Sequence, residues 1–123
     1  MYLKFYFLRH ELWDTVIPAI LAENNKEAQI LSYYLSEIDL DFANVILTHL
    51  QNDNNFDLSS QSWGVEVEKN KVIINFLYDE ENKEFTSCLS TVTFKKALAL
   101  WAEFLKKQPN VDYEEHHTIG VED

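Results

Sequence analysis

The chain has 123 residues, with 21 Asp and Glu against 10 Lys and Arg, and a formal net charge of −11. This charge repels phosphate backbones and leaves no basic patch, so it argues against nucleic-acid binding. Hydrophobic residues make up 46% of the chain and aromatic residues 14%, too much for a disordered acidic segment, and the length suits one folded domain.

The chain has one cysteine, Cys88, which cannot form an internal disulfide, as is usual in a reducing compartment. Its apolar runs are too short for a membrane span, and the N-terminal residues contain no small-residue cleavage site. We therefore expect a cytoplasmic protein that does not enter membranes and is a monomer when free.

The first half of the sequence favours helices. Residues 2–8 alternate loosely and fit either a short strand or the start of a helix. Asp14 can cap a helix over 15–22 that has Pro18 near its first turn.

Two further helices are predicted after this point. Asn24 and the acidic residue three positions later resemble a capping box, and apolar residues then recur at helical spacing. Asp41 can cap the next helix, which we expect to end at residues 52–55.

The second half changes to the two-residue period of strands. Residues 63–67 alternate, residues 69–71 suit a turn, and residues 72–78 are apolar on both faces, which predicts a central strand. An acidic turn over 79–84 leads to a third strand over about 85–91.

An amphipathic helix follows, with Thr93 as its expected cap and Pro109 after its end. Its apolar stripe consists of Phe94, Ala97, Leu98, Trp101, Phe104 and Leu105. We expect Leu98 and Trp101 of this stripe to form the core together with Ile74 and Phe76 of the central strand. The predicted fold is a single α+β domain over residues 1–109, with N-terminal helices, an antiparallel meander of three or more strands and this C-terminal helix. We expect residues 110–123 to form an acidic, extended or partly ordered tail.

The sequence contains no catalytic motif. Cys88 lies among small residues and is expected to be a buried, inert thiol. His116 and His117 are adjacent rather than four residues apart on a helix, so they predict a solvated segment rather than a metal site. His49 fits a packing role on its helix. We therefore expect no enzymatic activity, no cofactor and no metal.

Carboxylates beside tyrosines are the best candidates for binding a protein partner, because aromatic anchors in a charged surface are typical of interfaces. The first candidate group is the acidic turn, with Tyr78, Asp79, Glu80, Glu81 and Glu84. The second group consists of Asp39 and Asp41, near Tyr33.

Residues 63–107 combine a hairpin that ends in an acidic turn, the segment FTSCLS over 85–90 and the helix FKKALALWAEFL over 94–105. In size, acidity and this pattern the chain resembles the small immunity proteins of bacterial contact-dependent growth inhibition and other polymorphic toxin systems. The resemblance implies a cytoplasmic protein that binds a toxin domain, commonly a basic nuclease, and covers its active site or substrate groove.

Other functions remain open on the sequence alone. One alternative is a generic acidic adaptor module that binds proteins but has no toxin partner. An enzyme acting on a cationic substrate would need convergent polar groups, which the sequence does not indicate. A DNA-mimicking inhibitor would favour a regular ladder of carboxylates, whereas the acidic residues here are scattered.

Overall fold

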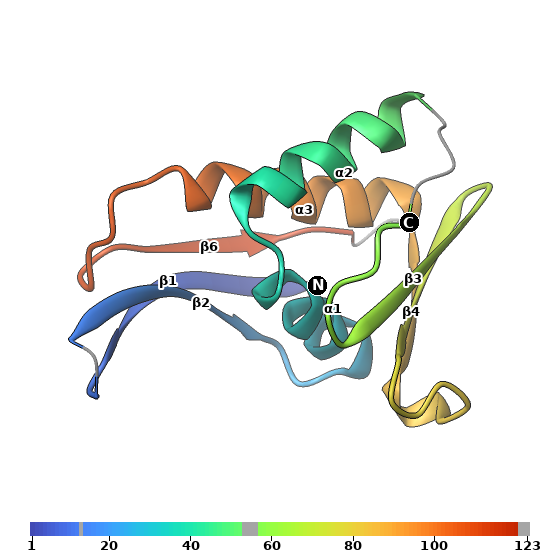
Figure 1. Cartoon of the computed structure of the whole chain (residues 1–123), viewed down its shortest axis with the longest axis horizontal. Helices are drawn as coiled ribbons and strands as arrows, with labels where there is room; N and C mark the ends of the chain where they lie inside the picture. The colour runs from blue at the N-terminus through green and yellow to red at the C-terminus, as the bar shows by residue number, and fades with distance from the viewer. Residues whose placement is uncertain (13, 53–56, 121–123) are drawn as a thin grey trace.

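The computed structural model describes residues 1–12, 14–52 and 57–120 (Figure 1). Within these ranges the chain has three α-helices and six strands. The strands form two antiparallel three-stranded sheets, with strand orders β2–β1–β6 and β3–β4–β5. The expected α+β class is confirmed. The elements are β1 (Tyr2–His10), β2 (Thr15–Ala22), α1 (Lys26–Ser36), α2 (Leu40–Asn52), β3 (Trp63–Glu68), β4 (Lys71–Phe76), the short 3-10 helix η1 (Lys83–Phe85), β5 (Thr86–Ser90), α3 (Thr91–Leu105) and β6 (Glu114–Thr118).

The chain begins with a β-hairpin rather than with helices. Residues 2–8 belong to β1, and the helix predicted over 15–22 is wrong, because this segment is β2 and pairs antiparallel with β1. Pro18 is tolerated because β2 lies at the edge of its sheet. Asp14 caps no helix there: it has a positive φ of 48°, and its carboxylate accepts a hydrogen bond of 2.7 Å from Arg9.

The segment after Pro109 is part of the folded unit and not a separate tail. Residues Glu114–Thr118 form β6, which pairs antiparallel with β1 and completes the N-terminal sheet. The Ile119 side chain is buried, and its backbone N–H donates to the Met1 carbonyl at 2.8 Å. The end of the expected tail, residues 121–123, lies outside the described residues, as do residues 53–55 of the turn expected after α2.

The helices start at different cap residues from those predicted. In each, a side-chain oxygen accepts a hydrogen bond from the backbone N–H three residues later, at 2.8, 2.8 and 3.0 Å. The observed caps are Asn25, Asp39 and Ser90, where we expected Asn24, Asp41 and Thr93. Several neighbouring residues can act as caps, and the local backbone selects the one with extended φ and ψ.

The second sheet confirms the predicted meander. Strands β3 and β4 are joined by a turn at Lys69 and Asn70, β4 is central as expected, and β5 follows the acidic turn. The backbone at Gly64 closely approaches β4 and the residue after it: a Cβ there would lie 2.9 Å from a Leu77 methyl group.

The core lies between the two sheets and the helices that pack on them: α1 contacts strands of both sheets, and α2 runs beside α3 (Figure 1). Trp101 is buried against Phe5 and Phe104, with ring centroids 5.0 and 5.6 Å apart. The predicted core residues Ile74 and Leu98 are also fully buried, whereas Phe76 is only partly buried. None of the helices in the described ranges is long and apolar enough to cross a bilayer.

Candidate partner-binding surface

The acidic turn after β4 has a defined conformation that Asn82 organises. The Asn82 side chain donates to Asp79 Oδ2 at 3.0 Å and accepts from the Glu84 backbone N–H at 2.9 Å. The Asn82 backbone carbonyl accepts a hydrogen bond from the Phe85 backbone N–H at 3.0 Å. These bonds hold the ends of the turn, while the side chains of Glu80, Glu81 and Glu84 stay exposed to solvent. The turn therefore presents carboxylates from a fixed backbone.

A row of aromatic rings leads from this turn to α1. Tyr33 on α1 stacks on Trp63 of β3, with centroids 6.0 Å apart, and Trp63 contacts Phe76 of β4 at 5.0 Å. Phe76 in turn contacts Tyr78 at 5.5 Å and Phe85 at 5.6 Å. Tyr33, Tyr78 and Phe85 are 53%, 73% and 43% exposed, so the row reaches solvent at both ends.

A groove of about 310 Å³ lies between α1 and the acidic turn. Ile30, Tyr33 and Phe85 supply its apolar lining, and Glu84 and Gln29 are among its polar residues. Lys26 at the start of α1 bridges to the turn, because its Nζ donates to the Lys83 carbonyl at 3.2 Å. We call the exposed rings, this groove and the carboxylates of residues 79–84 the acidic–aromatic surface.

Glu37 fixes the loop that places Trp63 against Tyr33. Its carboxylate accepts from the Ser60 hydroxyl at 2.6 Å and from the Ser62 backbone N–H at 2.9 Å. Burial raises the pKa of Glu37, but these hydrogen bonds outweigh burial and leave it below its ordinary value. Glu37 is therefore held as a carboxylate that anchors the start of β3 to α1.

The structure joins Tyr33 of the second predicted group to the first group and places Asp39 and Asp41 elsewhere. Tyr33 and Tyr78, predicted in different groups, are linked through Trp63 and Phe76. Asp39 instead caps α2 and lines a different hollow, of about 310 Å³, beside Pro18 and Trp101. Asp41 lies exposed in the first turn of α2.

Sequence reasoning missed Phe76 and Phe85 as members of this surface. The apolar faces of β4 predict a core position for Phe76, and the sequence pattern places Phe85 only in a strand. Phe85 lies in the short 3-10 helix η1, at the end of the acidic turn. No local pattern indicates that Trp63 links these rings to Tyr33, which lies more than forty positions before them in the chain.

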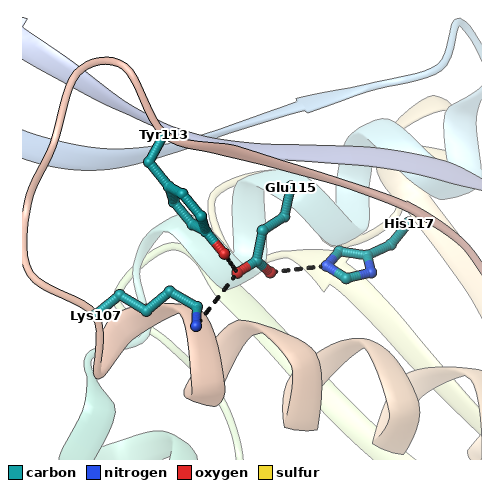
Figure 2. Close-up of polar contacts among 4 residues, drawn as sticks. All are labelled: Lys107, Tyr113, Glu115 and His117. Atoms are coloured by element: carbon teal, nitrogen blue, oxygen red, sulfur yellow. Dashed lines mark hydrogen bonds and ion pairs between the residues drawn. The ribbon is translucent and has the colours of Figure 1, made fainter.

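A second polar cluster lies on the inner face of β6 and corrects the prediction of a solvated histidine segment (Figure 2). His117 Nε2 lies 2.9 Å from Glu115 Oε1, and the Tyr113 hydroxyl donates to Glu115 Oε2. Lys107, just after α3, lies 3.8 Å from the same carboxylate. On the opposite face of β6, His116 contacts the Tyr2 hydroxyl through Nδ1.

The Glu115 cluster fastens β6 to the end of α3. Burial raises the pKa of Glu115. The hydrogen bonds from Tyr113 and His117 and the nearby charge of Lys107 lower this pKa by more than burial raises it, so it lies below its ordinary value. The carboxylate thus contacts three partners already. Within residues 1–12, 14–52 and 57–120, no three His, Cys, Asp or Glu side chains are grouped to hold a metal ion.

Cys88 also differs from the prediction, because its side chain is exposed rather than buried. It lies on the outer face of β5 and lines a hollow with Glu23 and Glu27. His49 is partly buried on α2 and lines a hollow with Val45 and Thr48.

These features define an α+β protein with an acidic–aromatic surface at one end of its second sheet. The chain belongs to the family described as "Family of unknown function (DUF5376)", whose model matches residues 1–119 and so spans every element from β1 to β6. The chain is 29% identical over 122 residues to the Pasteurella multocida (strain Pm70) protein described as "Uncharacterized protein PM0491", and the match covers 94% of each chain. No solved structure matches.

Proposed function

We propose that this chain is a cytoplasmic immunity protein that binds a basic toxin domain, most simply a nuclease, and covers its active site or substrate groove. The observation that carries the proposal is the acidic–aromatic surface, in which exposed Tyr33, Tyr78 and Phe85 adjoin the carboxylates of residues 79–84. The proposal assigns the chain no catalytic activity, metal or cofactor.

The physical basis is complementarity to a nuclease. A nuclease binds a polyanion and is positively charged around its active site, so an acidic protein is attracted to the same surface. Opposite fields raise association rates by roughly 10- to 1,000-fold, and rapid capture is what neutralising a lethal enzyme requires. Aromatic side chains at the centre of an interface then slow dissociation.

The test uses the product of the gene that neighbours this chain's gene as the candidate toxin domain, purified after co-expression. Charge reversal of Glu80, Glu81 and Glu84 to Lys should slow association about tenfold or more at low salt and flatten its salt dependence. The matched control reverses Glu66, Glu68 and Glu103, which are also exposed, and gives the same net charge. The control should retain most of the association rate if the acidic turn forms the interface.

The aromatic part of the surface is tested through dissociation. Tyr33→Ala and Phe85→Ala should each raise the dissociation rate, by roughly 5- to 30-fold for a loss of about 1–2 kcal/mol.

Equal association rates for the two charge-reversed variants would remove the acidic turn from the interface. If co-expression and native pull-downs recover no basic partner, the chain is better described as a generic acidic adaptor module.

A further inference from the structure

A row of polar contacts on the outer face of the N-terminal sheet has no part in the proposed function. The Tyr2 hydroxyl of β1 is hydrogen-bonded to His116 Nδ1 of β6, and the two ring centroids lie 5.9 Å apart. On the other side of the imidazole, His116 Nε2 lies 3.5 Å from a carboxylate oxygen of Glu114. A hydroxyl, an imidazole and a carboxylate are therefore connected in that order.

The strand pairing of β1 and β6 brings these three side chains together. Tyr2 lies opposite Thr118 in the register, and Lys4 lies opposite His116. Residues two apart on a strand lie on the same face, so His116 is the diagonal neighbour of Tyr2 and shares its face with Glu114. The backbone ladder therefore holds the Tyr2 hydroxyl beside the imidazole.

Lys4 fixes the carboxylate end of this row. Its Nζ lies 3.0 Å from Glu114, and this hydrogen bond is the main reason why the pKa of Glu114 lies below its ordinary value. A carboxylate next to Nε2 favours the imidazole tautomer with its proton on Nε2, which leaves Nδ1 as the acceptor for the Tyr2 hydroxyl. The His116 and Glu114 side chains are 52% and 47% exposed, so small molecules in solution reach them.

We infer that Tyr2 is a nucleophilic modification site, with His116 as its general base, for an electrophile of the acyl or sulfonyl class. The bond between Tyr2 Oη and the electrophilic atom forms, and the bond to the leaving group breaks. The leaving group departs as an anion with the bonding electrons, while the phenol proton passes to His116 Nδ1. Glu114 stabilises the imidazolium that results. The inference does not rest on the proposed function, because it concerns the chain alone.

The chain supplies its own internal controls. Tyr6 lies on the same face of β1 and is partly buried, as Tyr2 is, but its ring lies 5.2 Å from the Lys4 ammonium. Tyr78 is 73% exposed, and its ring packs against Phe76. Access alone therefore predicts that Tyr78 reacts first, whereas a base at His116 predicts that Tyr2 reacts first.

The experiment treats the purified chain with benzenesulfonyl fluoride and follows the adduct at each tyrosine by tandem mass spectrometry. We expect Tyr2 to react about tenfold or more faster than Tyr6 and Tyr78, a smaller factor than general bases give in closed active sites, because the pair is exposed. His116→Gln keeps a hydrogen-bonding side chain but no base, and it should remove this advantage. His117→Gln is the matched change on the inner face of β6 and should keep it. Free imidazole should restore part of the rate in His116→Ala.

Three outcomes would overturn the site. The first is a native chain in which Tyr78 reacts faster than Tyr2. The second is an equal rate at Tyr2 in His116→Gln and His117→Gln. The third is a loss of rate in His116→Ala that imidazole does not restore, which would make His116 a positioning residue rather than the base. Circular dichroism checks that the variants fold, and His116→Asn replaces His116→Gln if that variant does not fold.

Discussion

Trp101 joins the N-terminal sheet to the helices through a few specific contacts. Its ring packs edge-on against Phe5, its Nε1 donates to the Ile38 carbonyl at 3.2 Å, and only 1% of the residue is exposed. A residue of this size in such a site leaves both a cavity and an unpaired carbonyl when it is removed.

Trp101→Ala is therefore predicted to lower the free energy of unfolding by about 3–5 kcal/mol. Urea unfolding followed by circular dichroism measures this change. Tyr78→Ala is the control: Tyr78 is 73% exposed, so we expect a change of at most about 0.5 kcal/mol. Similar costs for the two variants would contradict the assignment of Trp101 to the core.

Glu115 gives a prediction about pH. Its folded-state pKa lies below the ordinary value of 4.5, because the hydrogen bonds and the Lys107 charge outweigh burial, which acts in the opposite direction. Folding therefore favours the carboxylate. This stabilisation is complete above pH 4.5 and is lost as the pH falls through the lower folded-state value.

Glu115→Gln should cost about 1–2 kcal/mol at pH 7 and should make the loss of stability on acidification less steep. Unfolding free energies measured between about pH 7 and pH 3 test both parts. Glu80→Gln controls for the loss of one negative charge on an exposed turn. The same pH profile in both variants would show that the Glu115 cluster contributes nothing specific.

At the level of elements, the observed starts of the helices differ from the starts that the sequence pattern predicts. The sequence favoured Asn24 as the cap of the helix that follows, but the Asn25 side chain makes the capping bond to the Ala28 backbone N–H at 2.8 Å. Asn24 instead accepts a hydrogen bond from the Gln29 side chain at 3.2 Å, on the surface.

Asn25→Ala is predicted to destabilise the protein by about 1 kcal/mol, because it leaves a helix N–H without its acceptor. Asn24→Ala should cost at most about 0.5 kcal/mol, as surface substitutions do. Thermal unfolding of the two variants side by side measures the difference. A larger loss for Asn24→Ala would mean that the capping box suggested by the sequence is the correct start of α1.

At the level of the whole molecule, β6 ties the end of the chain to its beginning. The strand lies beside β1, Ile119 is buried, and Tyr113 stacks on Phe104 with ring centroids 6.2 Å apart (Figure 1). Residues 110–120 therefore contribute backbone hydrogen bonds and apolar contacts to a sheet that starts at residue 2.

Truncation after Pro109 should destabilise the whole domain by more than about 3 kcal/mol or prevent its soluble expression, because it opens the β1 edge and uncovers the core. Urea unfolding and expression level measure this. Ile119→Ala is the milder variant and should cost about 2–5 kcal/mol. A truncated chain with unchanged stability would restore the prediction that residues 110–123 form an extended or partly ordered tail.

Local periodicity in the sequence determined part of the fold. The two-residue alternation of residues 63–67, the apolar strand after it and the helical stripe around Trp101 each predicted the element that forms. The acidic turn was also identified correctly as a turn, because charge and turn propensity depend on neighbouring residues alone.

Long-range pairing decided the rest. Residues 15–22 are a strand because β1 supplies their hydrogen bonds, and the polar segment 114–118 is a strand because the free edge of β1 does the same. The acidic–aromatic surface likewise needs Tyr33, Trp63 and Phe85, which the fold brings together from α1, β3 and η1. A sequence states which residues favour an element, but only the tertiary structure decides which partner lies opposite each element.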